Sequence, residues 1–184
     1  MADQTFTSGQ ILTAAQMTAL QSNSGLVPIT PGSVTNGTLS GYKISIAGQS
    51  TCTINDIFST NYDAYQIVCT EMTGSTNMWI TFKFGSTTTG YYAAHDSDAF
   101  TNRSTFDEVM YATTNGGGGV VNVVNPFLAK YTQLTTFSPV MLTAGNMGTF
   151  GGFIFNTTSY TSMTISTSGG TFTGTIVVYG YRKS

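Results

Sequence analysis

The sequence predicts an all-β protein, a β-sandwich of the jelly-roll type with a short N-terminal helix and an extended arm. Two features of the composition point to this class. Charged residues make up 8% of the 184-residue chain, against about 25% in an ordinary globular protein. Aromatic residues reach 12%, whereas a disordered chain is poor in aromatic and β-branched residues. We therefore expect one folded core whose surface is made soluble by hydroxyl and amide groups.

The third feature is a series of short alternating segments, of which two at residues 57–84 form a predicted hairpin. In the first, IFSTNYDAYQIVCT at residues 57–70, Tyr65, Ile67 and Cys69 fall on one side of a strand. The second, MWITFKF at residues 78–84, alternates again after a connection rich in Gly, Ser, Thr and Asn. These two segments are expected to form the centre of the sheet core.

Residues 5–24 contain the one convincing helical pattern. Thr13 is placed to cap a helix over residues 14–20, with Gln16 at the capping-box position. A helix this short is unstable alone and has to dock on something. Two interpretations stay open: the helix packs on its own domain, or it anchors a partner protein. For the second, the expected contact residues are Phe6, Ile11, Leu12, Met17 and Leu20.

Residues 25–41, GLVPITPGSVTNGTLSG, predict an arm, because Pro28 and Pro31 favour extended neighbours and the glycines allow turns. Regular alternation starts at Tyr42. We therefore divide the chain into a helix and arm for attachment, residues 1–41, and a β-sandwich domain, residues 42–184. Many strands at about 8–12-residue spacing indicate a sandwich or jelly roll. The expected strands are residues 42–47, 50–57, 64–70, 78–84, 108–113, 119–124, 132–137, 149–155, 160–166 and 171–181.

Two long connections interrupt these strands. The first, residues 85–107, contains Tyr91, Tyr92 and Phe100, whose rings are expected either to pack on the sheet or to bind a sugar or a neighbouring subunit. The second holds four consecutive glycines, residues 116–119, and predicts a flexible hairpin tip. A phosphate-binding loop is excluded there, because a strand follows where a helix and a Lys would be needed.

Catalytic and metal-binding patterns are weak. His95 is the only histidine, and with Asp96 and Asp98 it falls short of the convergent ligands that zinc or calcium requires. The Gly-x-Ser-x-Gly nucleophile motif is absent from the sequence. Asp107 and Glu108 are adjacent, so in a regular strand they would face opposite sides rather than form a catalytic pair. We therefore predict no enzymatic activity, no metal and no cofactor.

The charge pattern and the two cysteines restrict the partners and the compartment. The six Lys and Arg are spread along a chain of net charge −2, and only Arg182 and Lys183 are adjacent. We therefore expect no nucleic-acid partner and little electrostatic obstacle to self-association. No run approaches the roughly 18 apolar residues of a membrane span. Residues 1–10 lack the features of a signal peptide, so Cys52 and Cys69 are expected to be reduced and buried.

Two stretches resemble bacteriophage structural proteins. FTSGQILTAAQM, residues 6–17, is similar to an opening of minor tail and tail-fibre proteins of tailed phages. The pattern F-S-x-x-Y-x-x-Y-x-I, from Phe58 to Ile67, resembles a sandwich domain of phage attachment and decoration proteins. Together they cover about an eighth of the chain, and neither contains a catalytic residue. The resemblance implies a virion part with an assembly role.

The combined interpretation is a virion structural protein, made in the cytoplasm of the host bacterium. A trimeric tail-fibre, receptor-binding or minor tail component is the first expectation, and a capsid decoration protein is the second. A carbohydrate-binding or carbohydrate-active sandwich is the third. The expected partners are copies of the chain itself, other virion proteins, and a glycan or protein of the host surface.

Overall fold

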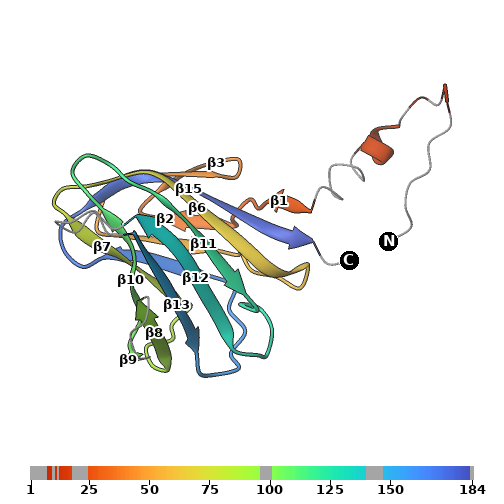
Figure 1. Ribbon diagram of the computed structural model, residues 1–184. Coiled ribbons are helices and arrows are strands. Elements are labelled where there is room, and N and C mark those ends of the chain that lie inside the picture. Colours follow the sequence, from red (N-terminus) through yellow and green to blue (C-terminus); the bar gives the residue numbers. More distant parts are fainter. Residues whose placement is uncertain are drawn as a thin grey trace.

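The computed structural model describes residues 8–9, 11, 13–17, 25–95, 101–139 and 147–182. In this part of the chain, fifteen strands form two antiparallel sheets that pack face to face as a sandwich (Figure 1). The all-β sandwich predicted from the sequence is therefore confirmed. The strands are β1 (Leu26–Pro28), β2 (Ser33–Thr35), β3 (Thr38–Ser40), β4 (Lys43–Gln49), β5 (Thr51–Asn55), β6 (Tyr62–Gly74), β7 (Met78–Phe84), β8 (Tyr91–His95), β9 (Thr101–Arg103), β10 (Phe106–Ala112), β11 (Gly119–Val124), β12 (Thr132–Pro139), β13 (Met147–Ile154), β14 (Met163–Thr167) and β15 (Phe172–Arg182).

The strand order is that of a jelly roll with additions. The larger sheet runs β3-β4-β15-β6-β11-β12-β13-β8-β9, with β1 also paired to β15, and the smaller sheet runs β10-β7-β14-β5-β2. Taken alone, β4-β15-β6-β11 and β5-β14-β7-β10 are the two four-stranded sheets that two Greek keys produce. Each segment expected as a strand from residue 42 onward overlaps an observed strand, because alternation of apolar residues is typical of a half-buried strand. The hairpin predicted over residues 57–84 was wrong, since β6 lies in the larger sheet and β7 in the smaller one. The glycines at residues 116–119 likewise connect β10 of the smaller sheet to β11 of the larger sheet and do not form a hairpin tip.

The segment expected as an arm, residues 25–41, is paired into both sheets. β1 pairs with β15, β2 with β5 and β3 with β4, and its apolar side chains Ile29, Val34 and Leu39 pack against the core. Gly37, between β2 and β3, lies so close to the core that an added Cβ would be 2.9 Å from Val34 Cγ1. The expected boundary at residues 41 and 42 therefore does not coincide with an end of the sheet pairing.

The pattern from Phe58 to Ile67 builds a corner of the core. The Tyr65 hydroxyl accepts a hydrogen bond from Ser59 N at 2.8 Å and lies 3.1 Å from Ser59 O, to which it donates. The Tyr65 ring contacts Phe58 edge-on, with centroids 4.8 Å apart, and Tyr62 at 5.8 Å. Burial raises the pKa of the Tyr65 hydroxyl despite these hydrogen bonds. The conspicuous polar and aromatic residues of this pattern therefore have a structural role here.

Two hairpins extend the larger sheet beyond the jelly roll. β8–β9 is inserted between β7 and β10, β12–β13 is inserted between β11 and β14, and the two hairpins join where β13 pairs with β8. The prediction of an irregular connection over residues 85–107 was therefore wrong. The strand was missed because YYAAH at residues 91–95 is short and shows no alternation of apolar and polar residues.

Candidate functional site

The candidate site is the outer face of the larger sheet, defined as the side chains of six adjacent strands that point away from the smaller sheet. Alternation and register assign sixteen residues to it. They are Tyr92, Ala94, Thr149, Gly151, Phe153, Gln133, Thr135, Val120, Asn122, Val124, Ala64, Gln66, Val68, Val177, Tyr179 and Tyr181.

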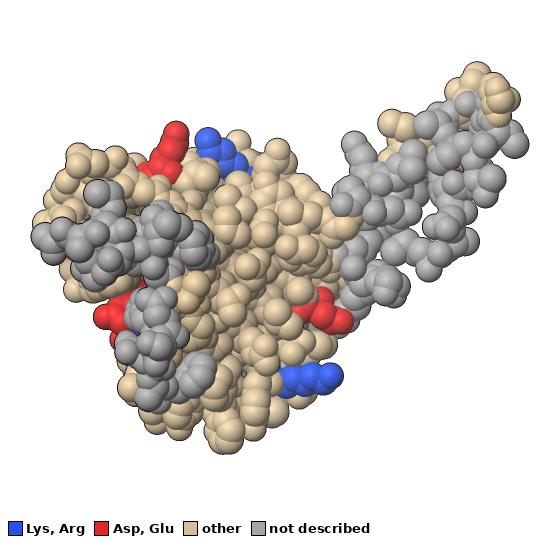
Figure 2. All heavy atoms as spheres, viewed as in Figure 1, with Lys and Arg blue, Asp and Glu red and all other residues tan. Residues whose placement is uncertain are grey.

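This outer face and its margin hold most of the exposed large apolar side chains of the sandwich. They are Val120 at 38%, Val124 at 39%, Tyr131 at 43%, Phe155 at 59% and Tyr181 at 41% exposure, while Tyr42, at 50%, lies in the turn before β4. None of the sixteen residues is charged. Figure 2 shows Lys, Arg, Asp and Glu toward the rim of the molecule, with described uncharged atoms over its middle. Charge depletion together with exposed aromatic rings is the composition of the centre of a protein interface.

Four rings at one end of this face form an aromatic patch: Tyr92, Tyr131, Phe153 and Phe155. Tyr92 and Phe153 are directly paired across β8 and β13, and their rings lie 5.5 Å apart with planes 13° from parallel. Tyr131 continues the group, 6.3 Å from Phe153 and 5.0 Å from Phe155. Because all four rings stand on or directly beside paired strands of the two hairpins, the sheet holds them in place before any partner arrives.

The patch depends on the junction of the hairpins. Phe155 N donates a hydrogen bond to Gly90 O at 2.7 Å, which continues the β13–β8 pairing past the end of both strands. Gly90 has a φ of +79°, a conformation that favours glycine. This bond therefore helps to fix Phe155 beside Tyr92, whose ring centroid is 6.1 Å away.

The structure corrects the expectation for Tyr91. Tyr91 is fully buried, and its ring meets Phe106 edge-on with centroids 4.9 Å apart. Its hydroxyl accepts a hydrogen bond from Phe84 N at 2.9 Å and donates to Thr87 O at 3.3 Å. Burial raises the pKa of this hydroxyl well above its ordinary value. Tyr91 therefore stabilises the core, and Tyr92, one residue later on the opposite side of β8, is the ring that faces outward.

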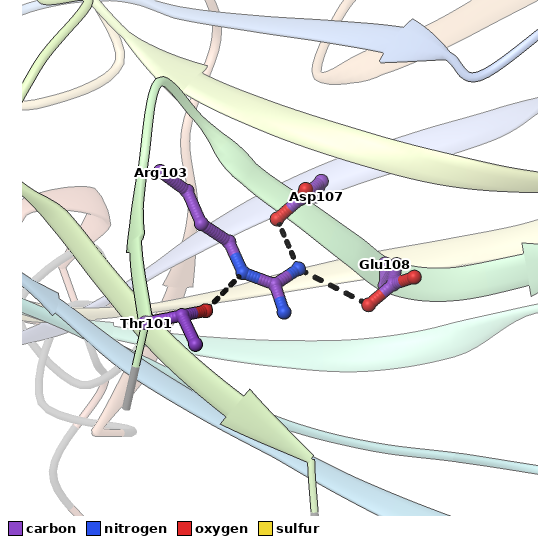
Figure 3. Close-up of polar contacts among 4 residues, drawn as sticks. All are labelled: Thr101, Arg103, Asp107 and Glu108. Atoms are coloured by element: carbon purple, nitrogen blue, oxygen red, sulfur yellow. Dashed lines mark hydrogen bonds and ion pairs between the residues drawn. The ribbon is translucent and has the colours of Figure 1, made fainter. Parts of the chain in front are cut away.

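The carboxylates of Asp107 and Glu108 converge on one guanidinium group (Figure 3). Arg103 Nη1 donates to Asp107 Oδ1 at 2.6 Å and to Glu108 Oε2 at 3.1 Å, while Arg103 Nε donates to Thr101 Oγ1 at 2.8 Å. The expectation that the two acids face opposite sides of a strand was wrong, because β10 has a bulge here and Glu108 has a φ of 66°. Partial burial lowers the pKa of Arg103, but its bonds to the two carboxylates outweigh that effect and raise it overall. The cluster ties the β8–β9 hairpin to β10, and its acids are held by an arginine.

The capping box predicted at the N-terminal helix is confirmed. Gln16 N donates to Thr13 Oγ1 at 3.2 Å, and Thr13 N donates to Gln16 Oε1 at 2.9 Å, at the start of the helical residues 14–17. Ile11 is 89% exposed and Met17 is 46% exposed. Among the other predicted contact residues, Phe6, Leu12, Leu20 and Phe100 lie outside the described residues.

The described residues contain no group of three or more His, Cys, Asp or Glu placed to hold a metal ion. The backbone of His95 pairs with Phe150, whereas Asp96 and Asp98 lie outside the described residues. No helix within the described ranges is long and apolar enough to cross a membrane.

The cysteines are free and buried, Cys52 in the smaller sheet and Cys69 in the larger one. Burial raises the pKa of Cys52 to about 11 and that of Cys69 to about 12, so these thiols are unreactive at neutral pH.

Sequence reasoning missed three rings of the aromatic patch, Tyr131, Phe153 and Phe155. A signal was present, because Phe153 and Phe155 alternate with the buried Ile154 in a segment that was correctly predicted as a strand. Their proximity to Tyr92 depends on the pairing of β13 with β8, which are far apart in the chain.

Comparison with protein-family models and with curated proteins finds no match to this chain.

Proposed function

We propose that this protein is a structural component of a bacteriophage virion, a tail-fibre, receptor-binding or minor tail protein that acts by binding rather than by catalysis. The observation that carries the proposal is the uncharged outer face of the larger sheet, on which exposed aromatic and aliphatic side chains are concentrated. A contiguous exposed surface of this kind marks a site of interaction in a soluble protein.

The two ends of the chain have different parts in this proposal. The N-terminal segment, which resembles the opening of phage tail proteins, attaches the protein to another virion protein through apolar side chains such as Ile11 and Met17, both exposed. The sandwich presents the outer face and the aromatic patch to a second partner. A weakly charged surface permits copies of one chain to pack closely, which suits the oligomer that this proposal includes.

The acidic residues support binding over hydrolysis. A glycoside hydrolase uses two carboxyl groups, one of them as an acid. Asp107 and Glu108 both bond to Arg103, at 2.6 and 3.1 Å, so the two carboxylates converge on one guanidinium rather than flanking a space for a substrate bond. The aromatic patch therefore serves to contact a partner surface.

Immunogold labelling of purified virions with an antibody against the sandwich tests the proposal. Gold at the tail is the expected result, and virions lacking the protein are the control. Gold on the head would replace the tail assignment by a capsid decoration protein. If washed virions contain no copy of the chain by mass spectrometry, the proposal of a virion component fails.

A further inference from the structure

A row of four side chains crosses the adjacent strands β9, β8, β13 and β12 and passes through the aromatic patch (Figure 1). Tyr92 is directly paired with Asn102 on one side and with Phe153 on the other. Phe153 is in turn paired with Gln133. Directly paired residues point to the same side of a sheet, so the order of side chains on the outer face is amide, ring, ring, amide. We call these four residues the amide–ring row.

The two amides of the amide–ring row are available to a ligand. Asn102 and Gln133 are exposed, and within the described part of the chain neither side-chain amide has a hydrogen-bond partner. The amides of Asn55, Gln66 and Asn156, by contrast, bond to other side chains of the sandwich. A side-chain amide offers two N–H donors and one C=O acceptor. The row therefore presents unused donors and acceptors on both sides of its rings.

Apolar ring surface lies between and beside these amides. The rings of Tyr92 and Phe153 are stacked with centroids 5.5 Å apart. Phe155, the next residue on the same side of the chain after Phe153, is 59% exposed. Its neighbour toward β8 is Gly90, whose missing side chain leaves Phe155 uncovered there, since a Cβ at Gly90 would be 3.7 Å from Phe155 O. Exposed apolar area therefore stands next to two unused amides.

This combination matches the chemistry of an uncharged sugar. A sugar ring presents C–H groups on its faces, which pack against aromatic rings, and hydroxyls at its edge, which both donate to and accept from amides. None of the four residues of the row is charged. The guanidinium of Arg103 in β9 is already bonded to Asp107 and Glu108. An acidic sugar would therefore find no unpaired cation in the row, whereas a neutral sugar needs none.

The dimensions of the row favour a chain of sugars. Neighbouring strands are about 4.8 Å apart, which is close to the length of one pyranose unit. The row therefore spans about 14 Å from one amide-bearing strand to the other, and a sugar chain lying across the strands brings successive units to successive side chains. The row is one side chain wide, which suits a chain-like ligand, whereas a folded protein buries about 800 Å² per partner and has to use more of the outer face.

From the unused amides, the exposed rings and the spacing, we propose that the amide–ring row and Phe155 bind an uncharged oligosaccharide of pyranose units. The rings pack against the faces of the sugars, and Asn102 and Gln133 bond to their hydroxyls. The inference goes beyond the proposed function, because the site is complete in a single chain and needs no other virion component. A protein partner that covers the same rings in a particle excludes the oligosaccharide, and the oligosaccharide excludes that partner.

Nuclear magnetic resonance of the full ¹⁵N-labelled chain tests this inference, because it resolves the N–H groups of side-chain amides. The probes are four uncharged hexasaccharides: maltohexaose, cellohexaose, mannohexaose and chitohexaose. With at least one of them, the amide signals of Asn102 and Gln133 should shift and saturate, while those of Asn55 stay in place. No saturable shift with any probe overturns the inference and leaves the proposed function standing. Tighter binding of hexagalacturonic acid than of every neutral probe overturns it as well.

Matched variants test the named side chains with the probe that binds. Asn102→Ala combined with Gln133→Ala should weaken binding about tenfold. Asn115→Ala is the control, because its amide is also exposed and, among the described residues, has no side-chain bond. Both changes lie at exposed positions, and thermal melts confirm that the variants are folded.

The rings have a control of their own. Phe155→Ala should weaken binding to a similar extent, whereas Tyr42→Ala, which removes a ring of 50% exposure outside the face, should not. Unchanged affinity of the folded double amide variant overturns the inference, and so does equal binding by Phe155→Ala and the unaltered protein. Virions that lack the protein would contradict the proposed function without changing any of these results.

Discussion

The two sheets of this sandwich present different outer faces to solvent. On the smaller sheet, polar side chains bond one another across strands: Thr53 with Thr164 at 3.0 Å, and Asn55 with Ser33 at 3.0 Å. The two aromatic side chains on the outer face of this sheet, Trp79 and Tyr111, are partly buried and pack against each other with centroids 4.8 Å apart. On the larger sheet, the outer face and its margin leave Val120, Val124, Tyr131, Phe155 and Tyr181 more than a third exposed.

This difference shows where a partner gains most free energy. Covering the smaller sheet would displace water from groups that already have partners, which changes the free energy little. Covering the larger sheet removes apolar area from water, at about 25 cal/mol per Å². Of the two faces, the larger sheet is therefore the one suited to binding.

The largest expected effect contrasts the inner and outer sides of β8. Tyr91→Ala should lower the free energy of unfolding by about 3–5 kcal/mol, because it empties a buried site and removes two hydrogen bonds. Tyr92→Ala should cost about 1 kcal/mol or less, since its ring is only partly buried. Urea denaturation of both variants provides the comparison. A Tyr92→Ala variant less stable than Tyr91→Ala would show that the outer ring belongs to the core.

A lysine placed on each outer face compares the faces directly. Val124→Lys should weaken incorporation into particles or self-association by about 2 kcal/mol, because a charge would be buried without a counter-charge. Thr35→Lys is its control on the smaller sheet, at an exposed position of the edge strand β2, and should change association little. Quantitative pull-down or sedimentation measures both variants. Equal losses would remove the distinction between the faces.

The two buried thiols test the interior of each sheet through the pH dependence of stability. An unfolded thiol loses its proton above about pH 9, whereas burial raises the pKa of Cys52 to about 11 and that of Cys69 to about 12. The contribution of each thiol to the free energy of unfolding is therefore complete below about pH 9. Between about pH 9 and the pKa of the buried thiol, this contribution falls by about 1.4 kcal/mol per pH unit. Urea midpoints across this range should fall less steeply in Cys52→Ala and in Cys69→Ala. An unchanged slope in Cys69→Ala would show that its thiol is accessible to water.

The smallest effect concerns the hydroxyl pairs of the smaller sheet. Thr164→Val removes the partner of Thr53 and should cost about 1 kcal/mol of unfolding free energy. On the larger sheet, the converse change Val68→Thr should stay within about 0.5 kcal/mol, because its site is partly exposed and makes no bond that the hydroxyl would break. Thermal melts resolve the order of the two. If Val68→Thr lowered the free energy of unfolding more than Thr164→Val, the assignment of the smaller sheet as the one stabilised by polar pairs would be wrong.

Ten of the fifteen strands and the capping box could be predicted because each depends on local spacing. The three strands at residues 26–40 could not, since each has only three residues and their prolines and glycines suggested a linker. Tyr91 and Tyr92 show the limit most clearly. They are adjacent and of the same type, and the sequence does not say which side of β8 faces the core and which faces outward. The aromatic patch needed the pairing of β8 with β13, and no local pattern encodes that contact.

Hydroxyl-radical footprinting of the protein, free and assembled in particles, tests most directly that the larger sheet is the binding face. The assembled form should show strong protection of Tyr131, Phe155 and Tyr181, whose exposures of 43%, 59% and 41% make them reactive in the free chain. Trp79 and Tyr111 on the smaller sheet should react alike in both forms. Protection of Trp79 and Tyr111 with no change at Tyr131, Phe155 and Tyr181 would contradict the account.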